Sequence, residues 1–433
     1  MIRKGYKMGY ERVTWCGDDA TEVAVVAGLD LGKAELACCL SKPDPDHPGR
    51  QLQAVTTWTT MTNSLTALAG YLIDQGVQLV AMEATSDYWK PVFYRMEAHG
   101  LNVIVVNAKH FKHVPGRPKT DKLDAQWLAR LASKGMLRAS FIPPADIRRL
   151  RDLTRDRADL VDQRNGNKNR VEKLLEDAGI KLSVVVSDIF GVSGRAMMEA
   201  LIAGQRDPAV LAEMAKGRMR AKRAVLIEAL TGLFTDHHSF RLRLLLDRVD
   251  QFDTDIATLE NRIDELIGPY RHQVDQLSAI PGVGVTNAEA IIAEIGVDMT
   301  RFPTANTLTS WAKFAPGVNE SAGKTRGTKS TGRGDKYLAR ALGQSAVATK
   351  TTKTFLGARY RRLSRRIGKQ KTQVAIGRSI LVVIWHLLSN PEAQWIDLGP
   401  NHYQQTHNRE RNIHAHLRAL HDLGYTVTLT PAT

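Results

Sequence analysis

Cysteine is scarce in this chain. Only Cys16, Cys38 and Cys39 occur among 433 residues, and no two of them have the CxxC spacing. Neither a disulfide framework nor a structural zinc site is therefore indicated. We expect a protein that works in a reducing cytoplasm.

Long apolar runs are also missing. The longest run, residues 380–385, is far shorter than the roughly 20 residues that cross a bilayer, so it is interpreted as part of a buried helix. The N-terminal residues 1–15 contain no apolar core of the kind that a signal peptide needs. A membrane is therefore not among the expected partners.

Acidic residues are too few to balance the basic ones. The chain has 60 Lys and Arg against 45 Asp and Glu, a formal charge of +15, while hydrophobic residues make up an ordinary 43%. A surplus of this size favours a polyanionic partner, because each phosphate that is neutralised releases counterions. Nucleic acid is the expected partner; a basic protein without such a role is the alternative.

The first part of the chain alternates between strand and helix signals. Apolar runs predict strands and periodic segments predict helices, in the order of three strands, then helix, strand, helix, strand, helix. The strands are expected at 22–30, 36–40, 52–58, 78–82 and 103–106, and the helices at 65–73, 88–98 and 121–132. This order fits an α/β domain of the ribonuclease H-like (RuvC-like) class over residues 22–140, after an N-terminal extension at 1–21.

Long helical segments follow this domain. Apolar residues at helical spacing in 146–177, 196–234 and 244–267 predict a helical coiled-coil arm over 146–268. Within the arm, a basic and amide-rich stretch is either a solvated face or a surface for a nucleic-acid backbone. Its cations are Arg164, Lys168 and Arg170. A mainly α-helical domain is expected at 277–390, before a basic, His-rich tail at 391–433.

Four acids occupy positions from which they could converge. Asp30 ends the first strand, Glu83 closes a strand expected beside it, and Asp121 and Asp124 share one face at the start of a helix. Each acid alone is more often a turn, cap or dipole partner. Together they would repel one another unless a cation lay among them, and carboxylate oxygens suit Mg²⁺ or Mn²⁺. We therefore predict a site in which two such ions clamp the oxygens of a phosphoryl transfer.

Basic and glycine-rich loops accompany these acids. Arg117 and Lys119 lie in a cationic loop before the third acidic block, where they could hold a scissile phosphate. The IPGVG turn, with Gly282 and Gly284, predicts a helix-hairpin-helix-like contact to phosphate, and a plain helical hairpin is equally open. Residues 314–335 are expected to form a long loop. Its candidate nucleic-acid-binding cations are Lys324, Arg326, Lys329 and Arg333.

Two serines in this long loop could act as nucleophiles. A serine can attack phosphorus and form a covalent phosphoserine where nearby cations or a metal lower the cost of ionising it. Ser321 and Ser330 are equally eligible on these grounds. The alternative is a DNA-binding loop without covalent chemistry.

Several sequence blocks together resemble one family. GLDLGK, MEAT and KTDKLDA are similar to the RuvC-like nuclease blocks of the DEDD-type transposases of the insertion-sequence-110 family, the bridge-RNA-guided recombinases. The segment from IPGVG to GRGDKYLARAL is similar to that family's C-terminal transposase domain. The resemblance implies that Asp30, Glu83, Asp121 and Asp124 bind catalytic metal ions and that Ser321 becomes joined to a DNA end. Here Ala322 separates that serine from the glycine that usually follows it.

The resemblance also implies the partners of the protein. They are double-stranded target and donor DNA, a structured noncoding guide RNA, and further copies of the chain in a homodimer or homotetramer with a composite site. The expected activity is that of an insertion-sequence DNA transposase and recombinase in the bacterial cytoplasm, associated with the nucleoid. Two alternatives stay open: a RuvC-like structure-selective nuclease that uses water as nucleophile, and a catalytically silent nucleic-acid-binding regulator.

Overall fold

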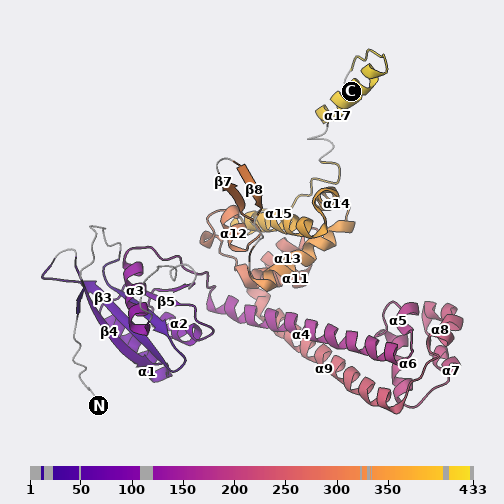
Figure 1. Ribbon diagram of the computed structural model, residues 1–433, viewed down its shortest axis with the longest axis horizontal. Helices are drawn as coiled ribbons and strands as arrows, with labels where there is room; N and C mark the ends of the chain where they lie inside the picture. The colour runs from indigo at the N-terminus through magenta and orange to yellow at the C-terminus, as the bar shows by residue number, and fades with distance from the viewer. Residues whose placement is uncertain are drawn as a thin grey trace. The chain divides into compact units, whose positions relative to one another are not determined.

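The computed structural model describes residues 11–13, 23–47, 50–107, 120–321, 324–328, 332, 334–402 and 409–429. For residues 11–13, 318–321, 324–328 and 409–412 it describes the backbone alone. The chain divides into two compact units, residues 1–142 and 143–433 (Figure 1).

The first unit is built on a mixed sheet in the order β1-β4-β3-β2-β5-β6. Its strands are β1 (Glu11–Val13), β2 (Val26–Leu31), β3 (Glu35–Pro43), β4 (Gln51–Thr59), β5 (Leu79–Glu83) and β6 (Val103–Val106). The strands β2, β3 and β4 form an antiparallel meander, whereas β5 pairs parallel with β2 and β6 pairs parallel with β5. This topology is ribonuclease H-like, so the predicted fold class is confirmed. Strand β1, inside the segment expected to be only an extension, pairs with β4 at the edge.

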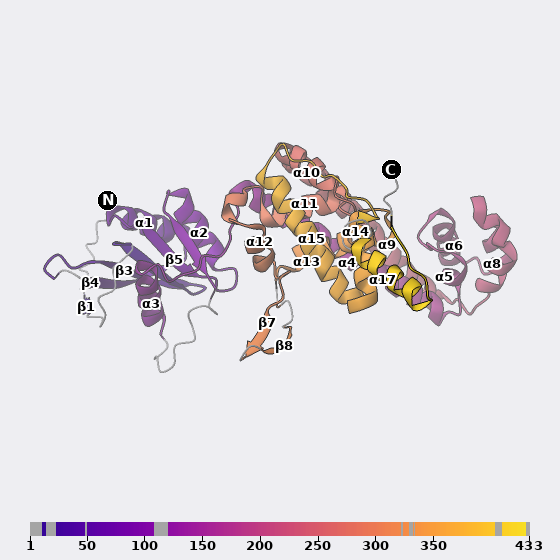
Figure 2. The same ribbon diagram turned by 90° about the horizontal axis from the view of Figure 1, so that it is seen from above.

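Three helices cover the two faces of this sheet. Helices α1 (Thr62–Asp74) and α2 (Trp89–Ala98) lie on one face, and α3 (Asp121–Ser133) lies on the other (Figure 2). Successive residues of a strand point to opposite faces, so each strand feeds two cores. On β2, Leu29 packs in the core under α1 and α2, while Val26 packs with the alanines of α3.

Gly28 lets α3 lie directly against β2. A Cβ atom at this position would be 2.2 Å from the carbonyl oxygen of Ala125 and 2.5 Å from the amide nitrogen of Ala129. Near the start of the strand, the Val23 amide donates to the carbonyl of Ser133, the last residue of α3, at 3.2 Å. Helix α3 therefore runs antiparallel to β2, and its first turn lies beyond Gly28, toward the end of the strand that carries Asp30.

Cys38 and Cys39 are neighbours on β3 and point into opposite cores. Both thiols are fully buried and neither forms a disulfide. Burial raises the pKa of Cys38 to about 12, and burial likewise raises the pKa of Cys39. Because the thiolate is the reactive form, these two side chains are inert packing groups in the folded protein.

We expect a Cys16→Ser variant to show almost no thiol reactivity while it is folded. At pH 8 a thiol with a pKa of about 12 is ionised in only about one molecule in 10,000, and burial adds a steric barrier. Titration with an aromatic disulfide reagent should detect both thiols only after denaturant is added. Rapid labelling of the native variant would contradict the buried placement of β3.

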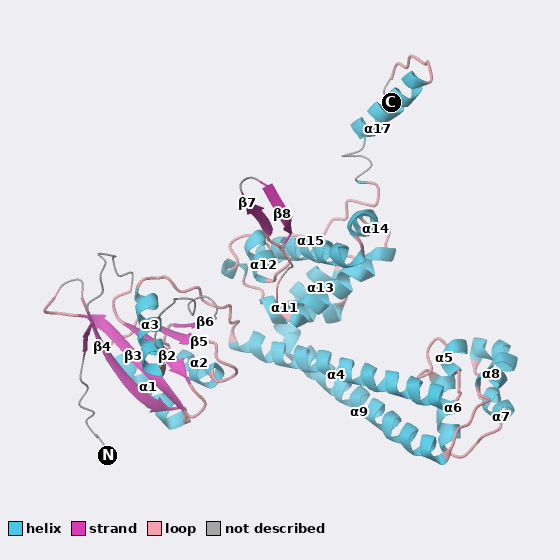
Figure 3. Ribbon diagram, viewed as in Figure 1, coloured by secondary structure: helices cyan, strands magenta, loops and turns pink. Residues whose placement is uncertain are grey.

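The second unit is almost entirely helical (Figure 3). Its helices are α4 (Ala145–Asp177), α5 (Leu182–Val185), α6 (Val192–Ile202), α7 (Pro208–Glu213), α8 (Arg223–Ala229), α9 (Asp236–Ile267), α10 (Arg271–Ser278), α11 (Val285–Ile295), α12 (Ala305–Trp311), α13 (Lys336–Ala348), α14 (Phe355–Ile367), α15 (Lys369–Ser389) and α17 (Arg409–Asp422). A hairpin of β7 (Val318–Ser321) and β8 (Lys324–Thr328) completes it.

Helices α4 and α9 pack along each other as an arm, and α5 to α8 close its far end (Figure 1). This end has a core of its own, to which Leu175, Met197, Leu226 and Leu242 contribute. The segment 196–234 was predicted as one helical stretch, but the structure divides it into separate helices. Two glycines with positive φ, Gly204 and Gly217, and the proline that opens α7 divide it.

Helices α10 to α15 form a bundle in which α15 packs against α12, α13 and α14. In the part of the chain that is described, α15 is the one helix that is long and apolar enough to span a membrane. Its residues Ile376, Ile380 and Ile384 are fully buried within the bundle, as in the core helix of a globular domain. The apolar run at 380–385 thus lies in a buried helix, as predicted.

The loop expected at 314–335 contains the β7–β8 hairpin, so this prediction was wrong for residues 318–328. The two strands pair antiparallel, with Ser321 opposite Lys324 and an irregularity between Val318 and Glu320. The segment is rich in Gly, Ser, Thr and cations, a composition that is typical of loops. Backbone pairing does not depend on apolar side chains, and the hairpin therefore left no clear pattern in the sequence.

Candidate active site

Asp30 and Glu83 stand at the carboxyl ends of two neighbouring parallel strands. The register between β2 and β5 pairs Val26 with Leu79 and continues to Leu29 with Met82. Asp30 and Glu83 are the next residues of their strands, so the two acids lie side by side at one edge of the sheet. Glu83 is almost fully buried, at 4% exposure, and Asp30 is half-buried.

Both of these acids point to the face that α3 covers. On β2, Gly28 abuts α3, and Asp30 lies two residues further on, on the same face. On β5, Ala81 packs with the alanines of α3, and Glu83 again lies two residues further on. The odd-numbered neighbours of Asp30, by contrast, pack under α1 and α2.

Asp121 and Asp124 occupy the first turn of α3. Thr120 caps this helix by accepting a hydrogen bond from the Leu123 amide at 3.3 Å. Acids in the first turn are stabilised by the exposed amides and the dipole of a helix. Because α3 runs antiparallel to β2, this turn lies at the Asp30 end of the strand. All four predicted acids are therefore gathered on one face, at one edge of the sheet.

We call the positions of Asp30, Glu83, Asp121 and Asp124 the acidic edge. It offers carboxylate oxygens, which are the ligands that Mg²⁺, Mn²⁺ and Ca²⁺ prefer. Among the described residues, no three Asp, Glu, His or Cys side chains are close enough together to hold an ion on their own. Asp30, Glu83 and Asp124 each make other polar or electrostatic interactions. The edge thus brings carboxylates from three segments to one face of the sheet, without a preformed metal-ligand cluster among the described residues.

Several candidate residues of the basic loops fall outside the described side chains. Ser321 ends β7 and Lys324 begins β8, and these two residues pair directly in the hairpin. Their side chains and that of Arg326 are not described. The residues that lie outside the described part of the chain altogether are Arg117, Lys119, Lys329, Ser330 and Arg333.

The two glycines of the IPGVG turn have different surroundings. The turn joins α10 to α11, and Gly282 has a φ of 90°. A Cβ atom at Gly282 would be 2.4 Å from the carbonyl oxygen of Ser345 on α13, so close packing alone requires glycine there. Gly284, the N-cap of α11, has nothing within 4 Å of such an atom. It is the glycine of this turn that leaves room for a ligand.

The three predicted cations of the arm also differ. Arg164 forms an ion pair with Asp253 of α9, and the ammonium group of Lys168 lies 4.8 Å from the centre of the Phe190 ring. These two side chains contribute to packing within the arm. Arg170 instead lines a pocket between α4 and α9.

An ion network that sequence reasoning missed joins the arm to the bundle. Arg155 of α4 donates to both carboxylate oxygens of Glu294, each at 2.7 Å, and to Asp335 at 2.7 Å. Arg151 donates to the backbone carbonyl of Glu294 at 2.7 Å. Burial raises the pKa of Glu294, an effect that the adjacent arginines oppose. Asp335 caps α13, so the end of the serine-bearing segment is fixed to α4. No local pattern connects residues this far apart in sequence.

A basic surface on α14 was also missed. Its helix and the start of α15 present exposed cations, whereas Arg361 is engaged with the backbone carbonyls of Lys350 and Thr352. The exposed cations are Arg362, Arg365, Arg366, Lys369 and Lys371. The signal that could have revealed this surface is the dense run RYRRLSRRIGKQK. Such a cluster on one helix is an electrostatic footprint for nucleic acid.

Two family models match separate parts of the chain. Residues 27–180 match the model of the IS110 DEDD transposases, described as a transposase, and this range contains all four acids. Residues 274–361 match the model of the transposase IS116/IS110/IS902 family, and this range contains the IPGVG turn and the hairpin. Together the two matches cover more than half of the chain.

Three relatives agree with the family models. An insertion element IS900 protein of 42 kDa from Mycobacterium paratuberculosis is 27% identical over 388 residues, which cover 84% of this chain and 95% of the relative. The transposase for insertion sequence element IS1111A from Coxiella burnetii is 25% identical over 327 residues, covering 73% and 79%. An insertion element IS110 protein from Streptomyces coelicolor is 33% identical over 114 residues, covering 26% and 28%.

Among solved structures, the RuvC structure of Thermus thermophilus matches 27% of this chain and 99% of its own, with 14% identity and a TM-score of 0.22. The assignment stands on the topology, the family models and the relatives. A DEDD acidic set on a ribonuclease H-like sheet indicates dependence on divalent metal ions and a DNA substrate. The chain belongs to the IS110 family of DEDD transposases, and the protein is a DNA transposase.

Proposed function

We propose that this transposase cuts and rejoins the DNA of an insertion sequence with a metal-binding carboxylate cluster and a serine nucleophile. The carboxylates are Asp30, Glu83, Asp121 and Asp124, and the serine is Ser321. The observation that carries the proposal is the antiparallel packing of α3 on β2 at Gly28. This packing supports a shared site, because it places acids from three separate segments on one face at one edge of the sheet.

The four carboxylates are suited to hold Mg²⁺ or Mn²⁺. Ions bound there supply Lewis-acid polarisation of the scissile phosphate and neutralise the charge that develops on its oxygens. In this proposal Asp30 and Glu83 would be ligands held by the sheet, and Asp121 and Asp124 would be ligands from the capped first turn of α3.

The covalent step would be a transesterification at phosphorus. The Ser321 oxygen forms a bond to the scissile phosphorus, and the bond from phosphorus to one deoxyribose oxygen breaks. The serine proton passes to that oxygen, which leaves as a hydroxyl group. Attack of a second DNA end's hydroxyl on the phosphoserine reverses these changes and rejoins the strands, so that no net phosphodiester bond is lost.

The basic loops and the helical surfaces would hold the nucleic acids. Backbone contacts are assigned to the predicted cations of the two loops, to the Gly284 turn and to the exposed cations of α14. The loop cations are Arg117, Lys119, Lys324, Arg326, Lys329 and Arg333. We further propose guidance by a structured noncoding bridge RNA that pairs with target and donor DNA.

Assembly and location complete the proposal. A homodimer or homotetramer would bring carboxylates and serine from different copies to one phosphate, at the nucleoid of a bacterial cell.

The working division of the chain is a RuvC-like domain at 22–140, an arm at 146–268, a transposase domain at 277–390 and a tail at 391–433.

Replacing Ser321 by Ala is expected to abolish the covalent protein–DNA adduct. Without the hydroxyl no phosphoserine forms, although the carboxylates and the DNA-binding surfaces remain. The protein would be incubated with guide RNA, labelled donor and target DNA and Mg²⁺, and then denatured and resolved on a gel. The matched control is Ser330→Ala, which should keep the adduct and strand exchange.

Other outcomes of this experiment identify the alternatives. An adduct that survives Ser321→Ala and disappears in Ser330→Ala would move the nucleophile to Ser330. Free DNA ends without any adduct in the unmodified protein would support hydrolysis by water, as in a structure-selective nuclease. Absence of metal-dependent cleavage would leave a nucleic-acid-binding regulator and overturn the proposal.

A further inference from the structure

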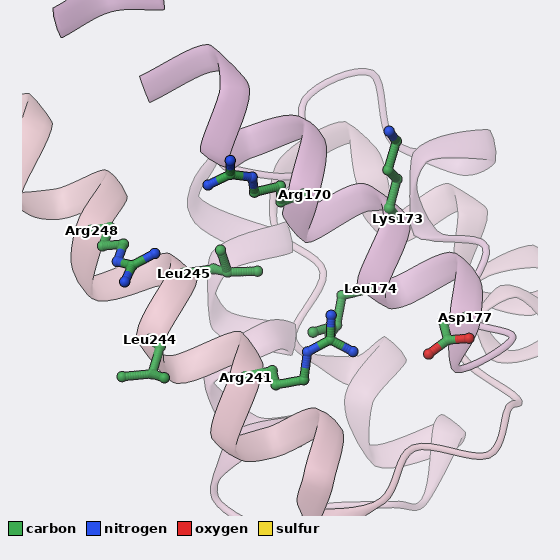
Figure 4. A pocket seen from close by; sticks show the side chains of 8 residues that line it. All are labelled: Arg170, Lys173, Leu174, Asp177, Arg241, Leu244, Leu245 and Arg248. Atoms are coloured by element: carbon green, nitrogen blue, oxygen red, sulfur yellow. The ribbon is translucent and has the colours of Figure 1, made fainter. Parts of the chain in front are cut away.

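The arm contains a basic pocket that the carboxylate and serine chemistry does not use. It lies between α4 and α9, has a volume of about 520 Å³ and is lined by four cations, two from each helix (Figure 4). Arg170 and Lys173 come from α4, and Arg241 and Arg248 come from α9. We call these four side chains and the space between them the arm pocket.

The cations of the arm pocket form no ion pair with the described acids. All four are exposed, and among the described residues none of them lies within 4.0 Å of a carboxylate. Asp177, the acid in the lining, is 3.4 Å from the ring of His238. Arg170 makes one long hydrogen bond of 3.5 Å to the side chain of Asn167.

Other arginines of the same arm are paired. Arg164 pairs with Asp253, Arg195 with Asp250, and Arg243 with Glu199. Arginines of the arm that serve packing or solubility therefore have an acidic side chain beside them. Four like charges around one pocket repel one another, and this cost is offset when an anion occupies the space between them.

The pocket is not required by the core of the arm. Of its apolar lining, Leu174 belongs to the core at the far end, whereas Leu244 is 45% exposed and Leu245 only half-buried. Replacing the cations would therefore leave the buried packing intact. Their convergence is better explained by a ligand than by folding.

The chemistry of the lining favours a sugar-phosphate backbone. Guanidinium and ammonium groups bind phosphate oxygens, and Arg does so with two donors at once. No aromatic side chain lines the pocket, so it lacks the platform on which bases of single strands stack. Arg241 and Arg248 are two helical turns apart, about 10.5 Å along the axis, so they can contact two different phosphates of one backbone.

We propose that the arm pocket binds the phosphate backbone of duplex DNA. The inference rests on the proposed function only in that DNA is the substrate. It assigns the arm a direct role in holding the DNA that the transposase recombines. Such a contact carries no sequence information but fixes the position of the duplex.

The test compares two double variants of the full-length protein. Arg241→Gln/Arg248→Gln removes both α9 cations of the pocket, and Arg243→Gln/Arg262→Gln removes two cations of the same helix that are ion-paired with Glu199 and Glu265. Both variants lose the same charge. The dissociation constant for a labelled duplex DNA would be measured by fluorescence anisotropy at several salt concentrations, without metal, so that binding is separated from cleavage.

The pocket variant is expected to bind duplex DNA about 10- to 50-fold more weakly near 0.1 M salt. The slope of log affinity against log salt should fall by about 2, because two phosphate contacts are lost. The control variant should bind within about threefold of the unmodified protein. Arg170→Gln/Lys173→Gln, which removes the α4 side of the pocket, should reproduce the loss and provides a second route should the first variant not fold.

Three results would overturn the inference. The first is an equal loss in pocket and control variants, which would reflect net charge alone. The second is an unchanged salt slope in both folded pocket variants. The third is a loss that affects a structured RNA duplex and spares DNA, which would assign the pocket to RNA. A failure of the proposed chemistry is recognised separately, because it would leave DNA binding intact and show as normal strand exchange in Asp121→Asn.

Discussion

Strand exchange by Asp121→Asn should fall by about 1,000-fold or more relative to the unmodified protein. The substitution keeps the shape of the side chain and removes one negative charge from the acidic edge, which weakens the binding of the catalytic cation. Binding of duplex DNA should change by less than about threefold, because the residue bears the wrong charge to contact phosphate. Quantitative gel analysis of recombined product over time, at fixed Mg²⁺, gives the ratio.

A matched control for this variant is Asp74→Asn. Asp74 is an exposed acid at the end of α1, on the face of the sheet opposite α3. It should exchange strands at the normal rate. Equal activity of the two variants would remove Asp121 from the mechanism, and partial rescue of Asp121→Asn by raised Mn²⁺ would support its role as a metal ligand.

Replacing Gly28 by Ala is expected to damage both the stability and the activity of the protein. The new Cβ atom would meet two backbone atoms of α3, at 2.2 Å and 2.5 Å, and a helix backbone cannot yield as a flexible side chain does. Overpacking of this kind costs about 1–3 kcal/mol or more. Because α3 must move away from β2, Asp121 and Asp124 also move away from Asp30, and strand exchange should drop even in the fraction that remains folded.

Gly70→Ala is the comparison for this prediction. Gly70 lies within α1, where an added Cβ atom meets nothing within 4 Å. Alanine in a helix is favoured over glycine by about 0.5–1 kcal/mol, so this variant should unfold at a slightly higher temperature and keep its activity. The melting temperature should therefore fall for Gly28→Ala and rise slightly for Gly70→Ala. A Gly28→Ala protein with normal melting and activity would contradict the close packing of α3 on β2.

The strands β2 to β6 were predictable because each has a short apolar run bounded by turn residues, which β1 lacks. Strand β6 has the predicted bounds, and β5 extends to Glu83, which the sequence already placed at its end. The helix α3 begins at the predicted Asp121 because Thr120 is a good cap. Periodicity and capping are local properties, so the sequence alone contains them.

The face on which the acids meet could not be predicted in the same way. It depends on the close approach of α3 at Gly28, and a single glycine in a strand has several explanations. The same holds for the network around Arg155, whose partners lie more than a hundred positions away in sequence. Tertiary contacts of this kind have no local signal. The β7–β8 hairpin is local, and it was missed because its strands lack an apolar run.

Arg155 is shared by Glu294 and Asp335, where α4 of the arm meets the bundle. This sharing decides how the effects of substitutions at these three residues must be interpreted. When one side chain serves two partners, removing any member changes what the other two can do, and the separate effects do not sum to the effect of the combined substitution. The three residues behave as one thermodynamic unit. A double-mutant cycle, and not a scan of single alanines, is the design that can apportion energy among them.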